Sequence, residues 1–147
     1  MVAQATQYAM GTVMTHKAFG PRTEDSLEAV CREVARIEGL FSRFLPESDV
    51  SHVNRSAGLK SEKVSRETYD VLSKAVEFSR RLPGCFDITI APLVALWNAG
   101  KEACAQPDAA SIQQVLPLVN YRDLILDPVE MTAGLRTTGQ SVDLGGI

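Results

Sequence analysis

Several features that would assign this sequence to a particular protein class are missing. No apolar run reaches the roughly 20 residues of a transmembrane helix, and residues 1–7 lack the basic and apolar regions of a signal peptide. The net charge of −3 gives no reason to expect binding to nucleic acid or to an anionic membrane. The three cysteines, Cys31, Cys85 and Cys104, form no Cys-x-x-Cys pair, which favours a reducing compartment.

The common catalytic motifs are missing as well. His16 and His52 have no Cys or His neighbour at metal-ligand spacing. The sequence also has no Walker or dinucleotide-binding glycine pattern and no Gly-x-Ser-x-Gly elbow. What remains is a chain of 147 residues, 45% apolar and 22% charged, which is ordinary for a globular protein. This length suffices for a core, so we expect residues 1–147 to form a single domain.

Apolar residues at three- and four-residue steps predict two long helices, over residues 23–44 and 65–82. Thr23 and Ser65 are the expected N-caps, and short helices are expected after Ser48 and after Asp108. The expected core face of the first helix consists of Leu27, Val30, Val34, Ile37, Phe41 and Phe44. In the short helix after Asp108, Ile112, Val115 and Leu116 are expected to face inward.

Strands are predicted over residues 7–19, 124–126, 131–138 and 141–144, with intervening turns at Gly and Pro. The order is a strand, then helices, then a cluster of strands. This order favours an α+β fold with a mixed or antiparallel sheet, two long helices and a short helix near residue 108.

The longest apolar run, residues 84–97, is interrupted near its start by Asp87. Pro92 excludes a long helix or a central strand through its middle, so we expect a buried, irregular segment. The backbone groups of such a segment need partners, which a nucleotide or flavin could supply. The alternative, favoured by this run alone, is a core segment in which Asp87 caps nearby N–H groups.

Four segments match, in the same order, sequence blocks of one protein family. Met10-Gly11-Thr12 is similar to an N-terminal Met-Gly-Thr, and residues 41–54, FSRFLPESDVSHVN, are similar to the block MSTYRPDSELSRFN. Residues 85–100 resemble GAFDPTVGPLVNLWGFG, and residues 143–147 resemble the start of DLGGIAKGYAVD. The sequence thus resembles the FAD:protein FMN transferases, the ApbE family, which implies an ApbE-like, T-fold-like α+β fold.

The resemblance also implies an activity. Family members bind FAD and, with Mg2+, transfer its FMN half to a threonine of an acceptor protein, releasing AMP. The expected partner is a flavoprotein acceptor, such as the FMN-binding domain of a redox complex. The alternatives are a flavin-binding or FAD-hydrolysing module without transferase activity, and a structural domain without a ligand.

Residue by residue, the resemblance assigns flavin contacts to Met10, Phe44, Cys85-Phe86-Asp87 and Asp143. Phe44 stands where the family has Tyr, so it can stack on a ring but cannot donate an O–H. For Met10, the alternative role is packing on the sheet. For Asp87 and Asp143, it is the capping of nearby backbone N–H groups.

The resemblance assigns one metal ligand, the backbone carbonyl of Gly146, in keeping with the preference of Mg2+ for oxygen ligands. The family's other protein ligands, an Asp and a Thr, would lie beyond Ile147. We therefore expect this chain to be the N-terminal portion of a longer transferase domain and to be inactive alone.

Overall fold

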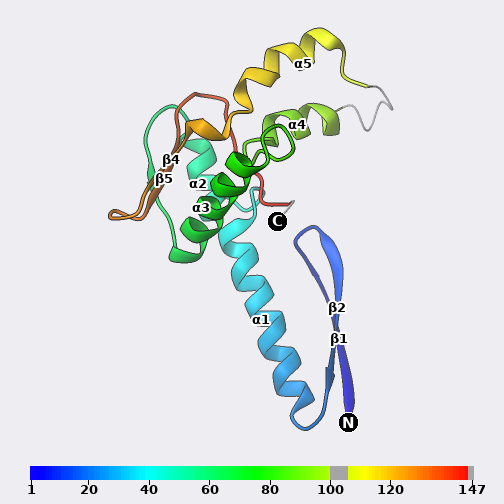
Figure 1. Ribbon diagram of the computed structural model, residues 1–147. Coiled ribbons are helices and arrows are strands. Elements are labelled where there is room, and N and C mark those ends of the chain that lie inside the picture. The colour runs from blue at the N-terminus through cyan, green and yellow to red at the C-terminus, as the bar shows by residue number, and fades with distance from the viewer. Residues whose placement is uncertain (100–105, 146–147) are drawn as a thin grey trace.

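The computed structural model describes residues 1–99 and 106–145 (Figure 1). The elements follow in the order β1 (Val2–Ala9), β2 (Thr12–Phe19), α1 (Thr23–Phe41), α2 (Asp49–Arg55), β3 (Glu62–Lys63), α3 (Arg66–Arg81), α4 (Ala91–Ala99), α5 (Ala109–Val115), the 3-10 turns η1 (Leu116–Leu118) and η2 (Tyr121–Asp123), β4 (Leu124–Asp127) and β5 (Thr132–Leu135). The two sheets are antiparallel, in the orders β1-β2 and β3-β5-β4. The expected α+β class is confirmed.

The N-terminal residues form a β-hairpin, so the prediction of one strand over residues 7–19 is wrong. β1 and β2 pair along their whole length, with Ala9 opposite Thr12. Met10 and Gly11 make the turn, with φ of 53° and 73°. Two residues at positive φ match the twist of the flanking strands, and glycine adopts this φ without strain. The period-two pattern runs through both strands and therefore does not reveal the reversal between them.

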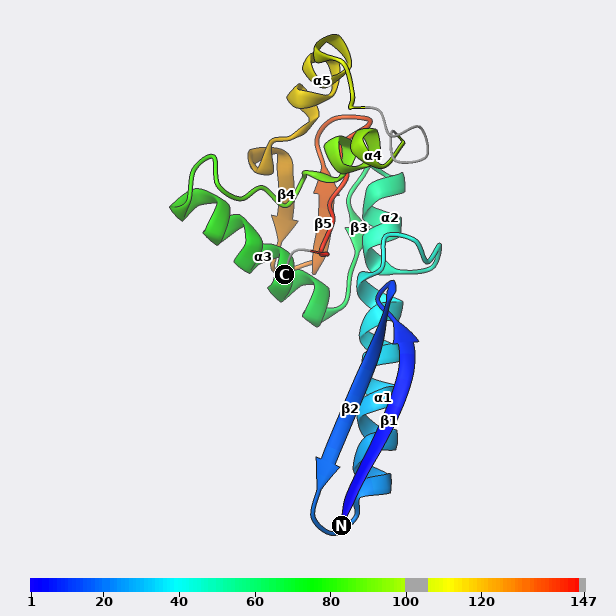
Figure 2. The same ribbon diagram turned by 90° about the vertical axis from the view of Figure 1, so that its right-hand side faces the viewer.

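Helix α1 packs on the hairpin, and the pair extends away from the other elements (Figures 1 and 2). Its N-cap is Arg22, in the left-handed region, and the expected cap Thr23 is instead its buried first residue. The helix ends at Phe41 rather than at Phe44. The expected core face is only partly buried, since Leu27 is buried but Val30 is 42% exposed.

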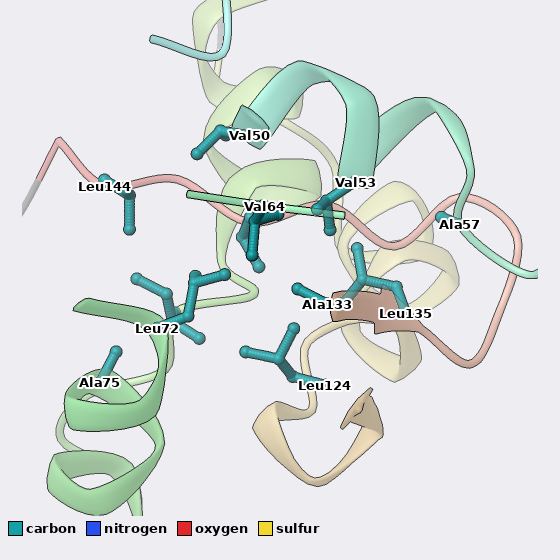
Figure 3. Packing of buried hydrophobic residues seen from close by; sticks show 12 residues of the cluster. Val50, Val53, Ala57, Val64, Leu72, Ala75, Leu124, Ala133, Leu135 and Leu144 are labelled. Atoms are coloured by element: carbon teal, nitrogen blue, oxygen red, sulfur yellow. The ribbon is translucent and has the colours of Figure 1, made fainter. Parts of the chain in front are cut away.

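The main core lies among α2, α3 and the three-stranded sheet, where apolar side chains point toward one another (Figure 3). It consists of Val50, Val53, Ala57, Val64, Leu72, Ala75, Ile88, Leu124, Ala133, Leu135, Val142 and Leu144. The N-caps expected for α2, α3 and α5 are confirmed: Ser48, Ser65 and Asp108 each accept a hydrogen bond from the backbone N–H three residues on. These short-range bonds fix where the core helices begin.

The sheet of the main core departs from the predicted strands. β5 is shorter than residues 131–138, and the two-residue strand β3 was not predicted. β3 is tied to the end of α2 because the Ser56 hydroxyl donates to the Glu62 carboxylate. This hydrogen bond, and then that from Lys60, hold the pKa of Glu62 below its ordinary value. The strand expected over residues 141–144 is not formed, since these residues belong to none of the described ladders.

The prediction of an irregular segment holds only for the first part of the apolar run. Residues 85–90 are irregular, but α4 begins at Ala91 and contains Pro92 as its second residue. At that position the missing N–H has no helical partner to lose, so proline is tolerated. After the next helix, α5, the expected inward residue Leu116 is 45% exposed. None of the helices in the described part of the chain has the length and apolar character to cross a membrane.

Two glycines make a matched test of this fold. Gly58 has φ +76°, and an added Cβ would lie 2.9 Å from Thr138 Cα and closer still to the Thr138 nitrogen and hydroxyl. We expect Gly58→Ala to lower the free energy of unfolding by more than about 1 kcal/mol, measured by urea denaturation. Gly39, inside α1, has open space around it, so Gly39→Ala should raise it by about 0.5–1 kcal/mol. Equal effects of the two changes would contradict the described path of residues 56–59.

Candidate functional site

The end of α1, the turn after it and α2 form a corner, residues 41–55, which we call the α1–α2 corner. Ser48 fixes its geometry, because its hydroxyl accepts from Ser51 N–H at 3.0 Å and donates to the Ser42 carbonyl. Val50 and Val53 anchor it in the core, with no exposed surface. Phe44, in contrast, is 78% exposed. The corner therefore holds one aromatic ring on the surface while its valines fix the backbone beneath.

Asn54 attaches the C-terminal segment, residues 142–145, to this corner. Its side-chain Nδ2 donates to the Val142 carbonyl at 3.0 Å, and its Oδ1 accepts from Val142 N–H at 2.8 Å. The amide thus pairs with both backbone groups of Val142, as a neighbouring strand would. The next residue, Asp143, donates its N–H to the Ile88 carbonyl at 3.1 Å. The backbone of this segment thus has hydrogen-bond partners although the segment belongs to no sheet.

Among the residues that the structure describes, the carboxylate of Asp143 has two partners. Oδ1 accepts from Gly145 N–H at 2.8 Å, and Oδ2 lies 3.0 Å from Nε of Arg43. The two side chains are only 20% and 17% exposed. Toward the described residues, the Arg43 Nε–H satisfies hydrogen-bond geometry with no acceptor, so the contact with Asp143 is an ion pair without a directed bond. The capping role considered for Asp143 is therefore present, together with a cation that the sequence did not reveal.

A pocket of about 340 Å³ opens on the outer side of the corner. It is lined by Arg43, Phe44, Pro46, Ser51, Asn54 and Arg55. The Arg43 guanidinium lies over the Phe44 ring, 4.6 Å from its centroid. Because Phe44 is 78% exposed, much of the ring outside this contact is free to stack on a planar ligand. The lining thus combines an aromatic ring with two arginines, a combination that suits an aromatic ligand carrying negative charge.

Asp87 is engaged with its own chain on both oxygens. Oδ1 accepts from the N–H and the hydroxyl of Thr89, at 2.9 and 2.6 Å, and Oδ2 accepts from Tyr121 N–H at 3.0 Å. Thr89 in turn accepts from Asn120 N–H at 2.7 Å. The alternative role considered for Asp87, capping, is present in the structure: Asp87 supplies partners to the irregular backbone. Its contact with flavin stays a prediction.

Met10, Cys85 and Phe86, the other predicted contacts, do not line the pocket. Met10, 41% exposed, donates its backbone N–H to Glu38 Oε1 at 2.7 Å, which ties the hairpin turn to the last turns of α1. Cys85 is an exposed free thiol, and Phe86 is half-buried against the core. For these residues the structure gives a position, and their flavin contacts stay predictions.

The predicted metal ligand Gly146 lies outside the described residues. Within residues 1–99 and 106–145, His, Cys, Asp and Glu side chains form no group of three or more that could hold a metal ion. Asp143, two residues before Gly145, already pairs with Arg43 and the Gly145 N–H. The assignment of a metal ligand to the Gly146 carbonyl stays a prediction.

Comparison with known proteins identifies the family. The sequence model of the ApbE family matches residues 10–147. The chain belongs to the ApbE family. As an ApbE-family chain, it is 33% identical over 138 residues to the FAD:protein FMN transferase of Klebsiella pneumoniae, covering 94% of this chain and 43% of that protein. It is 25% identical over 150 residues to the enzyme of that name from Treponema pallidum, covering 96% and 41%.

Solved ApbE structures have the same fold. The crystal structure of the ApbE protein from Thermotoga maritima matches with a TM-score of 0.89 at 25% identity, over 100% of this chain and 48% of that one. The flavin transferase ApbE from Vibrio cholerae matches with a TM-score of 0.84 at 22% identity, over 100% and 49%. The ApbE chain described here thus spans about half the length of its solved relatives. The resemblance found in the sequence is confirmed.

The structure brings the ApbE blocks together. Residues 142–145 dock on the block 41–54 through Asn54 and on residues 85–90 through Ile88. The Met10 turn reaches the end of α1 through Glu38. Sequence reasoning had not singled out Arg43, Asn54 or Arg55. Asn54 ends a block that matches the family, which was an available signal. The pairing of Arg43 with a residue 100 positions away left no local signal.

Asn54 gives a test of this docking. We expect Asn54→Ala to lower the free energy of unfolding by about 1–3 kcal/mol, because both backbone groups of the buried Val142 lose their partner. Urea unfolding measures the change. Asn98, exposed in α4, is the control, and Asn98→Ala should have little effect. Full stability of the Asn54 variant would mean that residues 142–145 are held by other contacts.

Proposed function

We propose that this chain is part of a flavin transferase, which binds FAD and, with Mg2+, transfers FMN to a threonine of an acceptor protein, releasing AMP. The observation that carries the proposal is the pocket at the α1–α2 corner, where the block of Phe44 meets the segment of Asp143 in a chain of the ApbE family. Relatives over this region are named FAD:protein FMN transferases.

The residues of the pocket and the two acids outside its lining have complementary roles in this proposal. Phe44 stacks on the isoalloxazine or adenine ring, and the arginines offset the charge of the phosphates. Asp143 accepts from a hydroxyl or amine of the ligand, since an ionised carboxylate can only accept. Asp87 keeps residues 85–90 in place through Thr89 and Tyr121. The site therefore needs one acid to hold its backbone and another to meet the ligand.

The reaction is a phosphoryl transfer. The threonine oxygen of the acceptor attacks the phosphorus of the FMN half, the bond from this phosphorus to the oxygen of AMP breaks, and the hydroxyl proton is released. The Gly146 carbonyl would supply one ligand to Mg2+, whose charge would neutralise the diphosphate. The acceptor is a flavoprotein domain that carries the target threonine, such as an FMN-binding domain of a redox complex.

Mass spectrometry tests the activity directly. The chain, alone and within any longer gene product that contains it, is incubated with FAD, Mg2+ and an FMN-binding domain with a target threonine. Transfer predicts an acceptor heavier by one FMN less water, with AMP released in equal amount. Replacing the target threonine by alanine should abolish the adduct. Release of AMP and free FMN without an adduct would instead support an FAD hydrolase, and FAD binding without release a flavin-binding module.

Phe44 provides a test of the binding mode. We expect Phe44→Ala to weaken FAD binding by about 1–3 kcal/mol, the usual size for loss of an aromatic stacking partner. Phe44→Tyr should bind nearly as well as the original, since the ring is kept. Quenching of flavin fluorescence measures the affinity. Phe19, 74% exposed on the hairpin, is the matched control, and Phe19→Ala should leave FAD affinity unchanged. Equal loss in both alanine variants would remove Phe44 from the site.

Asp143→Asn separates the ligand role of this residue from its structural role. Asn keeps an oxygen that can accept from Gly145 N–H but loses the charge that faces Arg43. We expect lower FAD affinity or FMN transfer, with the melting temperature nearly unchanged. A lower melting temperature with full transfer per folded molecule would show that Asp143 serves only the structure.

A further inference from the structure

The hydrogen-bond donors that line the pocket are unequally available. The Asn54 amide uses Oδ1 and one of its two Nδ2–H donors on Val142, and the Ser51 hydroxyl donates to the Ser42 carbonyl at 3.3 Å. Arg55 uses Nη1 on the Pro46 carbonyl at 2.6 Å. Arg43 contacts Asp143 through Nε, and no described residue accepts a hydrogen bond from its terminal amino groups. The hydrogen-bond donors that remain available in the lining therefore belong mainly to the guanidinium groups of Arg43 and Arg55.

The charges of the pocket have the same sign. The six lining residues include two arginines and no acid, and Asp143 offsets one of the two charges from behind. A planar guanidinium donates two parallel hydrogen bonds to a phosphate, which suits it better than a neutral hydroxyl ligand. Arg43 is also held in place, since its side chain is 17% exposed and lies between Asp143 and the Phe44 ring. A donor fixed in this way loses little freedom when it binds an anion.

In this chain the arginine and the aromatic residue follow an order that differs from that of the family block. The family block quoted above reads Thr-Tyr-Arg where this chain has Arg43-Phe44-Leu45. The positive charge therefore precedes the aromatic residue here, on the side that reaches Asp143.

We propose that Arg43 makes the pocket selective for nucleotides with a diphosphate, with Asp143 holding the guanidinium so that its terminal amino groups face the phosphates. The inference rests on the proposed function, because FAD is such a nucleotide. It assigns Arg43 a contact with the ligand, and the Arg43–Asp143 ion pair the task of positioning that contact.

The test compares ADP with adenosine, which share the base and sugar and differ in the diphosphate. Both are titrated into the ¹⁵N-labelled 147-residue chain at constant ionic strength, and amide shifts of Asn54 and Gly145 are followed by NMR. We expect ADP to bind roughly tenfold or more tightly than adenosine, the size of one or two charge-assisted hydrogen bonds. Arg43→Met should abolish this preference, and Arg43→Lys, which keeps the charge without the planar fork, should retain part of it.

Arg66→Met is the matched control. Arg66 is exposed on α3 and paired with Asp70, so its replacement changes the net charge equally and should leave the ADP preference intact. Equal affinity for ADP and adenosine, no ADP binding at millimolar concentration, or the same loss in the Arg66 variant would overturn the proposal. Should Arg43→Met fail to fold, an undiminished preference in Arg43→Lys would overturn the role of the guanidinium fork.

The outcome is separable from that of the proposed function. An ADP preference that depends on Arg43 in a protein without FMN transfer would refute the transferase and leave this inference standing. FMN transfer by a protein whose ADP preference is unaffected by Arg43→Met would support the transferase and refute the role of Arg43.

Discussion

The pairing of the Asn54 amide with Val142 is the interaction on which the candidate site depends. It joins residues 88 positions apart and gives the backbone of residues 142–145 a partner that no strand supplies. Val142 and Leu144 are buried on one side of this segment, so Asp143 between them faces the α1–α2 corner. The position of the Asp143 carboxylate relative to Arg43 and Phe44 therefore follows from a single side-chain amide and two apolar anchors.

The site also depends on the position of residues 41–55, between the outlying helix α1 and the main core. Along most of its length α1 is covered only by the hairpin, whereas the residues after it enter the core through Val50 and Val53. The pocket lies at this transition, where Phe44 is exposed on a backbone that Ser48 and the two valines hold. Ring stacking needs an exposed face and phosphate binding needs fixed donors, and a turn anchored on one side provides both.

Local features of the sequence predicted local features of the structure well. Ser48, Ser65 and Asp108 cap helices because each bond spans three residues and depends on little else. Family blocks located Phe44 and Asp143, which the fold brings to one corner. The sequence did not predict three features. They are the hairpin, the start of a helix at Ala91 and the lack of a strand over residues 141–144. In each case a short-range pattern was compatible with two structures, and contacts with distant residues decided between them.

Asp87 and Asp143 differ in how firmly their carboxylates are bonded to their own chain, and therefore in how readily they can meet a ligand. Removing Asp87 from its partners would leave the N–H groups of Thr89 and Tyr121 without acceptors in a largely buried region, a cost that ligand contacts would have to exceed. Asp143 has one directed bond, from Gly145, and an ion pair with Arg43 that lacks hydrogen-bond geometry. Either member of that pair can take a ligand group while the two charges remain near each other. Because the two charges stay paired, a ligand contact at Asp143 or Arg43 costs less than one at Asp87, and Arg43 can stay in place while the ligand binds.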